Sequence, residues 1–164
     1  MIIITIKELI KDFNLHLTFI GDGISKLYLE EFVKKNSLDK NVSFLGNYSR
    51  EKIYDTLKDY DLLVQPSRHE GFGLTVVEGI FARIPILVSN IDGPFEIIKQ
   101  GEYGHFFKKD DVNSLITSIK NIIKKTDIEI NAELEEAFNY AKENFDVKKT
   151  ATNYLNLYNL IKEK

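Results

Sequence analysis

Apolar residues in this chain alternate between short continuous runs and stripes at helical spacing. The runs predict five strands, at residues 15–20, 42–45, 62–65, 85–89 and 105–107. The stripes between these runs predict five helices, at residues 2–13, 24–35, 50–58, 74–82 and 95–99. Short apolar strands that alternate with helices indicate a parallel, doubly wound α/β sheet with helices on both faces.

The last third of the chain is predicted to be helical. Residues 111–125 and 128–144 carry helical stripes, and a closing helix is expected over residues 146–163. We find no internal repeat and no low-complexity linker, so residues 1–164 are interpreted as one Rossmann-like domain.

One stretch breaks two local rules. In the helix predicted at 74–82 only Thr75 and Glu78 are polar, and a carboxylate is rarely enclosed by protein unless something pairs with it. Gly79 follows directly, although a glycine inside a helix costs about 1 kcal/mol relative to alanine. Local rules tend to fail together at functional sites, so we place the candidate site here.

The turn before this helix favours an anion. Gly71 and Gly73 permit positive φ angles, and the free N–H groups of the following helical turn favour phosphate. Glu78 lies about 7 Å further along the helix, within reach of a ribose next to such a phosphate. Glu70 precedes the turn and would face the other side of a diphosphate. This geometry suits a nucleotide sugar.

In a parallel sheet the loops after the strands share one edge, where ligands bind. Glycine recurs in these loops, at residues 21–23, 46–48, 67–73 and 90–93. We therefore expect Gly21 and Gly23 to belong to the ligand-binding cleft.

Composition excludes several classes of function. A net charge of −3 argues against a general nucleic-acid binder. The chain has no cysteine, and its three histidines show no ligand spacing, so no metal site is expected. No run approaches the length of a membrane span, and the first residues lack the features of a signal peptide. These features fit a cytoplasmic protein. Peripheral membrane association of the full-length protein stays open.

At these residues the sequence resembles the donor-binding, C-terminal half of retaining glycosyltransferases of family 4, the group 1 type with GT-B architecture. The family's hallmark is a glutamate, seven residues and a second glutamate, with Gly-Phe-Gly-Leu after the first, and residues Glu70 to Glu78 match it. The resemblance covers residues 15–107 and, more loosely, the later helices. Further matching residues are Gly21, Asp22, Gly23, Phe44, Leu45, Gly46, Pro66, Ser67, Pro85, Ser89, Asn90, Gly93, Glu96 and Phe145.

The resemblance implies a role for each site residue. Glu78 would bind the ribose hydroxyls and Glu70 the transferred sugar. The amides of residues 71–74 would hold the diphosphate or sugar hydroxyls; these residues are Gly71, Phe72, Gly73 and Leu74. Backbone near Asn47 and Tyr48 would face the base. The donor would be a UDP- or GDP-sugar and the acceptor a glycan or lipid-linked molecule, with no metal and no assigned nucleophile.

Two departures from the family pattern affect these expectations. The family places a first strand and an Arg and Lys that clamp the diphosphate before the helix that opens this chain. These elements, and the N-terminal acceptor-binding domain, would lie before Met1, so the chain is expected to be one half of an enzyme and inactive alone. Arg83 replaces a usual glycine at a helix end, so either the turn differs or Arg83 is strained.

Three alternatives remain at this point. The chain could be a non-catalytic nucleotide-sugar-binding or interaction module, or a GT-B type sugar-nucleotide epimerase. A glycosidase with two carboxylates fits less well, because it needs opposed acids about 5–9.5 Å apart across the substrate. The sequence does not identify the sugar, the base or the acceptor.

Overall fold

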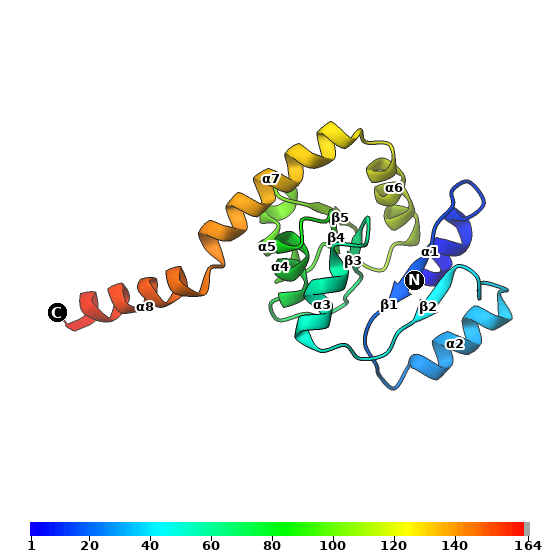
Figure 1. Cartoon of the computed structure of the whole chain (residues 1–164), viewed down its shortest axis with the longest axis horizontal. Coiled ribbons are helices and arrows are strands. Elements are labelled where there is room, and N and C mark those ends of the chain that lie inside the picture. The colour runs from blue at the N-terminus through cyan, green and yellow to red at the C-terminus, as the bar shows by residue number, and fades with distance from the viewer. Residues whose placement is uncertain (163–164) are drawn as a thin grey trace.

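The computed structural model describes residues 1–162, and Figure 1 shows the arrangement of its elements. The strands are β1 (Leu17–Phe19), β2 (Val42–Phe44), β3 (Leu63–Gln65), β4 (Ile86–Ser89) and β5 (His105–Phe107). The helices are α1 (Ile2–Leu9), α2 (Lys26–Lys35), α3 (Arg50–Leu57), α4 (Leu74–Phe81), α5 (Pro94–Ile97), a 3-10 turn η1 (Lys99–Gly101), α6 (Val112–Ile123), α7 (Asp127–Asn144) and α8 (Val147–Lys162).

The predicted parallel α/β class is confirmed, and the strands form two sheets. β1 pairs with β2, with Thr18 opposite Ser43, and the second sheet has the order β3-β4-β5. Every strand pair is parallel. The residue at which the predicted closing helix ended, 163, lies outside the described residues. No helix among residues 1–162 combines the length and apolar character that crossing a membrane requires.

β4 is the centre of the larger sheet, and all of its residues are buried. Ile86 and Val88 belong to a core cluster with Val76 and Ile80 of α4, whereas Leu87 packs on the other face against α1 and α6. This alternation explains the continuous apolar run at 85–89, because a central parallel strand needs apolar side chains on both faces.

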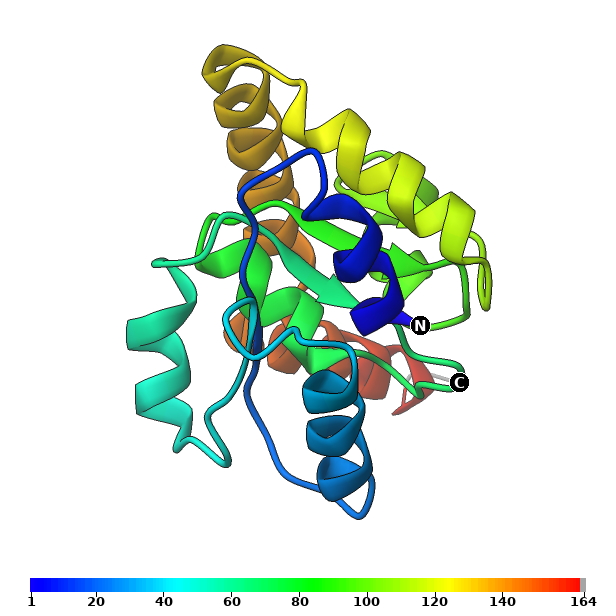
Figure 2. The ribbon, with the colours of Figure 1, turned by 90° about the vertical axis from the view of Figure 1, so that its right-hand side faces the viewer.

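α1 joins the two sheets. Its Leu9 packs in the cluster that contains Leu87, and its Ile3 packs with Val33 and Val42 of the smaller sheet's layer. Figure 2 shows α1 between α6 and α2. The predicted helix at 2–13 therefore forms over a shorter range, but its apolar stripe does face the core.

Two loops meet through a glycine. Gly93, before α5, has φ +80, and a Cβ added there would lie 2.8 Å from the carbonyl oxygen of Phe72 and 3.1 Å from that of Glu70. The loop after β3 thus rests directly on the backbone of the loop after β4. Only glycine permits both this contact and this conformation.

A second glycine permits close packing of α4 on the sheet. A Cβ added at Gly79 would lie 2.5 Å from Cδ1 of Ile86, so α4 lies unusually close to β4 at this point. At the end of α4, Arg83 adopts a left-handed conformation with φ +56. Of the two expectations for Arg83, the strained one is confirmed. The guanidinium pairs with Glu135 and lies 4.1 Å from the ring centroid of Phe138.

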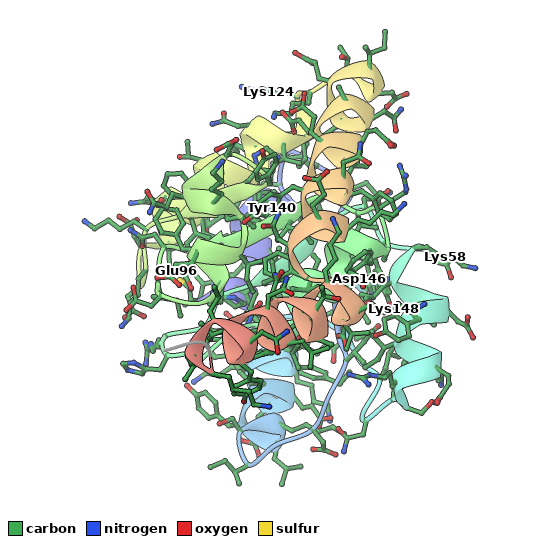
Figure 3. All side chains as sticks on the ribbon, turned by 90° about the vertical axis from the view of Figure 1, so that its left-hand side faces the viewer. Lys58, Glu96, Lys124, Tyr140, Asp146 and Lys148 are labelled. Carbon is green, nitrogen blue, oxygen red and sulfur yellow. The ribbon has the colours of Figure 1, made fainter. Side chains whose placement is uncertain are left out.

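The C-terminal helices bend at Asp146, whose carboxylate accepts hydrogen bonds from the N–H groups of Lys148 and Lys149. Figure 3 shows Tyr140 on α7, before the bend, where it stacks on Tyr103 with ring centroids 4.1 Å apart. After the bend α8 extends away from the body (Figure 1), and all of its described side chains are exposed. Its exposed apolar residues are Val147, Tyr154, Leu155, Leu157, Tyr158, Leu160 and Ile161.

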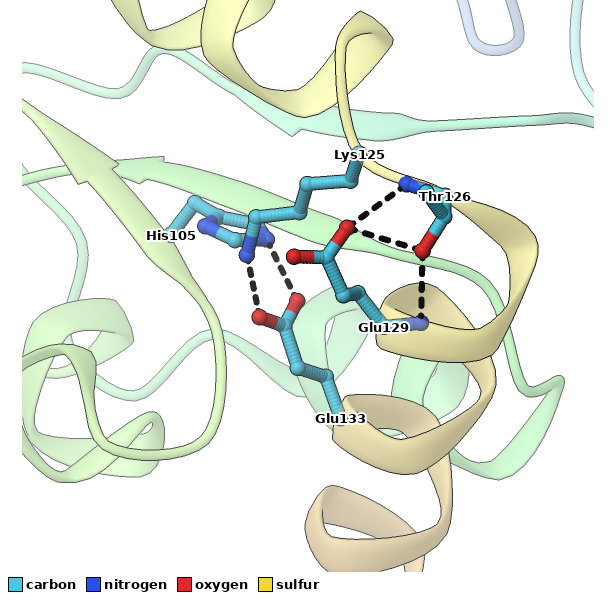
Figure 4. Close-up of polar contacts among 5 residues, drawn as sticks. All are labelled: His105, Lys125, Thr126, Glu129 and Glu133. Atoms are coloured by element: carbon cyan, nitrogen blue, oxygen red, sulfur yellow. Dashed lines mark hydrogen bonds and ion pairs between the residues drawn. The ribbon is translucent and has the colours of Figure 1, made fainter.

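A polar cluster fixes the start of α7 (Figure 4). The Thr126 side chain and the Glu129 carboxylate cap each other's backbone N–H groups. Beside them, the Glu133 carboxylate contacts the Lys125 ammonium and lies 3.3 Å from His105 Nε2. Burial lowers the pKa of His105 below its usual value, the Lys125 charge lowers it further, and Glu133 opposes both effects.

The Gly93 contact predicts a stability difference. Gly93→Ala should lower the free energy of unfolding by about 1–3 kcal/mol, because the new methyl group meets backbone carbonyls in a left-handed residue. Gly71→Ala is the matched control, because a Cβ there meets no atom within 4 Å, and it should change stability by no more than about 0.5 kcal/mol. Urea denaturation measures both, and equal effects would contradict this account.

His105 predicts part of the pH dependence of stability. Above its ordinary pKa of about 6.5 both folded and unfolded states hold it neutral. As the pH falls, the unfolded chain binds a proton at His105 before the folded chain does. The free energy of unfolding therefore decreases as the pH drops from the ordinary pKa of His105 to its lowered pKa in the folded state. The fall in melting temperature from about pH 7.5 to about pH 5.5 should be smaller in His105→Gln than in the native chain. The exposed His69 provides the control, His69→Gln. An unchanged fall in His105→Gln would show that burial of His105 has no such effect.

Candidate functional site

The loop after β3 carries Glu70 at the edge of the larger sheet. The Glu70 carboxylate accepts a hydrogen bond from the Gly71 N–H at 3.1 Å and one from the Gln65 side-chain amide at 3.3 Å. Gln65 is buried at the end of β3, so it anchors an otherwise exposed acid. The carboxylate is thereby oriented before any ligand arrives.

Glu70 lines a hollow of about 680 Å³, which we call the Glu70 hollow. The other lining residues come from the ends of β3 and β4 and from the segment after β5; they are Arg68, His69, Gly71, Asn90, Ile91, Asp92 and Lys109. Asn90 accepts a hydrogen bond from the Lys109 N–H at 2.7 Å, and Arg68 forms an ion pair with Asp110 at 2.7 Å. The hollow is therefore lined by both acidic and basic side chains that can form hydrogen bonds.

Glu78 lines a different hollow. Glu78 is half-buried on α4. With the exposed Thr75 it lines a groove of about 370 Å³ between β1 and β3, which we call the central groove. None of the ion pairs within residues 1–162 involves Glu78. The carboxylate is therefore not held by a basic side chain of the described chain.

The start of α4 lies between these two hollows. Gly71 lines the Glu70 hollow, and Thr75 lines the central groove. Gly73, the residue before the helix, has a left-handed φ of +101 and packs against Pro94. Phe72 and Leu74 are exposed on either side of it. The first N–H groups of α4 lack acceptors within the helix, as at any helix start.

The other predicted site residues lie in the layer of the smaller sheet. The Gly21 N–H donates to the Gly46 carbonyl at 2.8 Å, which joins the loops after β1 and β2. Gly21 and Gly23 line a shallow hollow of their own beside α2. Asn47 is exposed, and the ring of Tyr48 lies 3.6 Å from Lys52 Nζ. Asn47 and Tyr48 line neither the Glu70 hollow nor the central groove.

Sequence reasoning assigned no ligand-binding role to Lys109, Arg68 or Asp92. The signal for Lys109 and Asp92 lay in the strand pattern, because both follow strands whose ends share an edge with β3. No group of three or more potential metal ligands occurs within the part of the chain that the structure describes.

Comparison with known proteins gives matches over most of the chain. Residues 2–145 match the family model described as "Glycosyl transferases group 1". An uncharacterized glycosyltransferase of Methanocaldococcus jannaschii is 34% identical over 142 residues, covering 82% of this chain and 40% of the relative. The O-antigen biosynthesis glycosyltransferase WclY of Escherichia coli is 30% identical over 156 residues, covering 95% of this chain and 42% of the relative.

Solved structures agree in fold. A glycosyltransferase from Rickettsia africae superposes with a TM-score of 0.84 at 21% identity, over 96% of this chain and 44% of that one. Anabaena HepE in complex with UDP superposes with a TM-score of 0.80 at 20% identity, over 94% of this chain and 44% of that one.

The chain spans about 40% of the length of the curated relatives it matches. The family model covers far more than half of the chain, and one relative of 34% identity covers 82% of it. This chain therefore belongs to the group 1 glycosyl transferases.

Proposed function

We propose that this chain is the donor-binding part of a retaining glycosyltransferase of family 4. It would bind a UDP- or GDP-sugar and present it to a glycan or lipid-linked acceptor held by an N-terminal domain of a longer enzyme. The observation that carries the proposal is the start of α4, which lies between two hollows that are each lined by one glutamate.

In this proposal the diphosphate binds at the start of α4. Leu74 and Thr75 form the first turn of α4, where N–H groups lack acceptors within the helix and the helix dipole adds a favourable field for an anion. Lys109 and Arg68, which line the neighbouring hollow, bring positive charge near the sugar-linked phosphate. In this arrangement the helix start and the basic side chains would bind the diphosphate, and we expect no metal.

The two glutamates would bind opposite ends of the donor. Glu78 would accept hydrogen bonds from the two ribose hydroxyls; it lines the central groove, and none of the ion pairs within residues 1–162 involves it. Glu70 accepts from hydroxyls of the transferred sugar in its own hollow, oriented by Gln65 and by the Gly71 N–H. Its role is to position the sugar, and no protein nucleophile is assigned. Departure of the leaving phosphate and entry of the acceptor on the same face would retain the anomeric configuration.

The names of relatives support the reaction class. One relative is named for O-antigen biosynthesis, and HepE was solved with UDP and with UDP-glucose. By this analogy the sugar would enter a surface polysaccharide, and the chain would need its acceptor-binding domain for turnover.

A nucleotide panel tests donor binding. Thermal unfolding of the chain is measured with UDP, GDP, ADP and their glucose esters. A bound nucleotide at about 100 times its dissociation constant should stabilise the folded state by about 2.7 kcal/mol. One base should be preferred over the others. The same panel is measured on the full-length enzyme, which would include the Arg and Lys expected before Met1. If no member of the panel shifts the unfolding transition of the full-length enzyme at millimolar concentration, the chain is not a donor-binding domain.

Substitution of the two glutamates tests their separate roles. Glu78→Ala should raise the dissociation constant of the free nucleotide about tenfold or more, because each charge-assisted hydrogen bond contributes about 1.5–3 kcal/mol. Glu70→Ala should leave the free nucleotide unaffected and weaken only the nucleotide sugar. Glu31→Ala, an exposed acid on α2, is the matched control. Calorimetric titration measures all three, and unchanged affinity in Glu78→Ala would remove that assignment.

A further inference from the structure

A series of four aromatic rings connects the start of α4 with the end of α7. The Phe72 ring lies edge-to-face with the Phe145 ring, with centroids 6.1 Å apart and an angle of 78° between the ring planes. The Phe145 ring lies in the same way against Tyr140, at 5.8 Å, and Tyr140 stacks on Tyr103. The series therefore begins in the candidate site and ends in the segment that follows α5.

The Phe145 ring is fixed by its own surroundings. Phe145 follows α7 directly, and its N–H donates to the Ala141 carbonyl at 2.7 Å. Its half-buried side chain packs against the core cluster that contains Val76 of α4. The next residue, Asp146, accepts N–H hydrogen bonds from the start of α8 at the bend (Figure 3). Phe145 is thus held between two helices, whereas Phe72 belongs to a turn.

The turn that carries Phe72 has little packing of its own. Gly71 and Gly73 flank Phe72, and glycine loses more conformational freedom on ordering than any other residue. Phe72 is 47% exposed, and a Cβ added at Gly71 would meet no atom within 4 Å. The Phe72 carbonyl packs against Gly93, and Gly73 packs against Pro94. The turn is therefore held by α5 through its backbone and by the end of α7 through the Phe72 ring.

We propose that Phe145 is a positioning residue of the donor site. Its ring holds Phe72 and so keeps the turn at residues 71–73 ordered before a nucleotide sugar arrives. The entropy cost of ordering two glycines then falls on folding rather than on donor binding, which lowers the dissociation constant of the donor. The effect on affinity rests on the proposed function, because it takes this turn as the diphosphate site. The ordering of the turn does not.

Phe138 offers a matched comparison on the same helix pair. It lies on α7 and also pairs edge-to-face with a ring of α4, that of Phe81, with centroids 5.8 Å apart. Phe81 is the last residue of α4, whereas Phe72 lies just before its first turn. Removal of the Phe138 ring therefore deletes a comparable contact at the other end of α4.

Backbone 15N relaxation tests the ordering of the turn without any ligand. In the native chain the N–H order parameters of residues 71–73 should be about 0.85, the value of a rigid backbone. In Phe145→Ala they should fall to about 0.6 or below, whereas in Phe138→Ala they should not change. Phe145→Tyr keeps the ring and should keep the native values. If Phe145→Ala does not unfold cooperatively, Phe145→Leu and Phe138→Leu replace the two alanine variants under the same criterion.

Calorimetric titration of the full-length enzyme with UDP-glucose, GDP-glucose and ADP-glucose tests the effect on affinity. Phe145→Ala should raise the dissociation constant of the donor that binds about two- to tenfold, which corresponds to the energy of one edge-to-face pair. Phe138→Ala should leave this constant unchanged. Phe145→Ala combined with Phe72→Ala should bind no more weakly than Phe72→Ala alone, because Phe145 acts through the Phe72 ring.

Several results would overturn the inference. Order parameters at residues 71–73 that are already low in the native chain would do so, as would an equal fall in Phe145→Ala and Phe138→Ala. A less ordered turn with unchanged donor affinity would remove the positioning role. The failure of the proposed function looks different: the native full-length enzyme then binds none of the three nucleotide sugars. In that case the claim about donor affinity falls with the proposed function, and the relaxation data alone decide whether Phe145 orders the turn.

Discussion

The structure depends on burial of β4 from both faces. Ile86 and Val88 pack against α4, and Leu87 packs against α1 and α6. Burial of each such side chain is worth about 1.5–3 kcal/mol, so this strand and its helices determine where the neighbouring loops lie. The loop with Glu70 and the start of α4 both follow β3, which pairs directly with β4. The candidate site is thus positioned by the most buried part of the molecule.

The local elements could be predicted from the sequence because their signals are local. Apolar runs predicted all five strands. Ser49 and Asp111 accept hydrogen bonds from the N–H groups of Lys52 and Ser114 at the starts of α3 and α6, which is the local capping that such side chains favour. The division into two sheets could not be predicted, because an apolar run predicts a strand but not which other strand it pairs with. The bend at Asp146 lies at the predicted start of the closing helix. The complete exposure of α8 could not be predicted, because it depends on which other segments pack against the helix.

The candidate site was predicted in part. The motif from Glu70 to Glu78 identified the loop and the helix. Gly79 was interpreted as a sign of a functional site, and in the structure it lets α4 lie close to Ile86 of the core. The two acids were expected on opposite sides of the helix start, but the other residues that line a hollow with each of them were not foreseen, because these residues come from distant parts of the chain. Lys109 joins the Glu70 hollow through the fold rather than through sequence proximity. The assignments of individual residues to ribose, phosphate or sugar stay predictions.

The close contact at Gly79 has a mechanical consequence. Because a single methyl group would collide with Ile86, α4 cannot slide or rotate on the sheet without losing this fit. The helix start and the neighbouring Glu78 therefore behave as a rigid part of the framework. Any adjustment to an incoming ligand therefore takes place in the exposed loop residues around His69 and Asp92. The site thus combines a fixed helix with two loops that can adapt to the ligand.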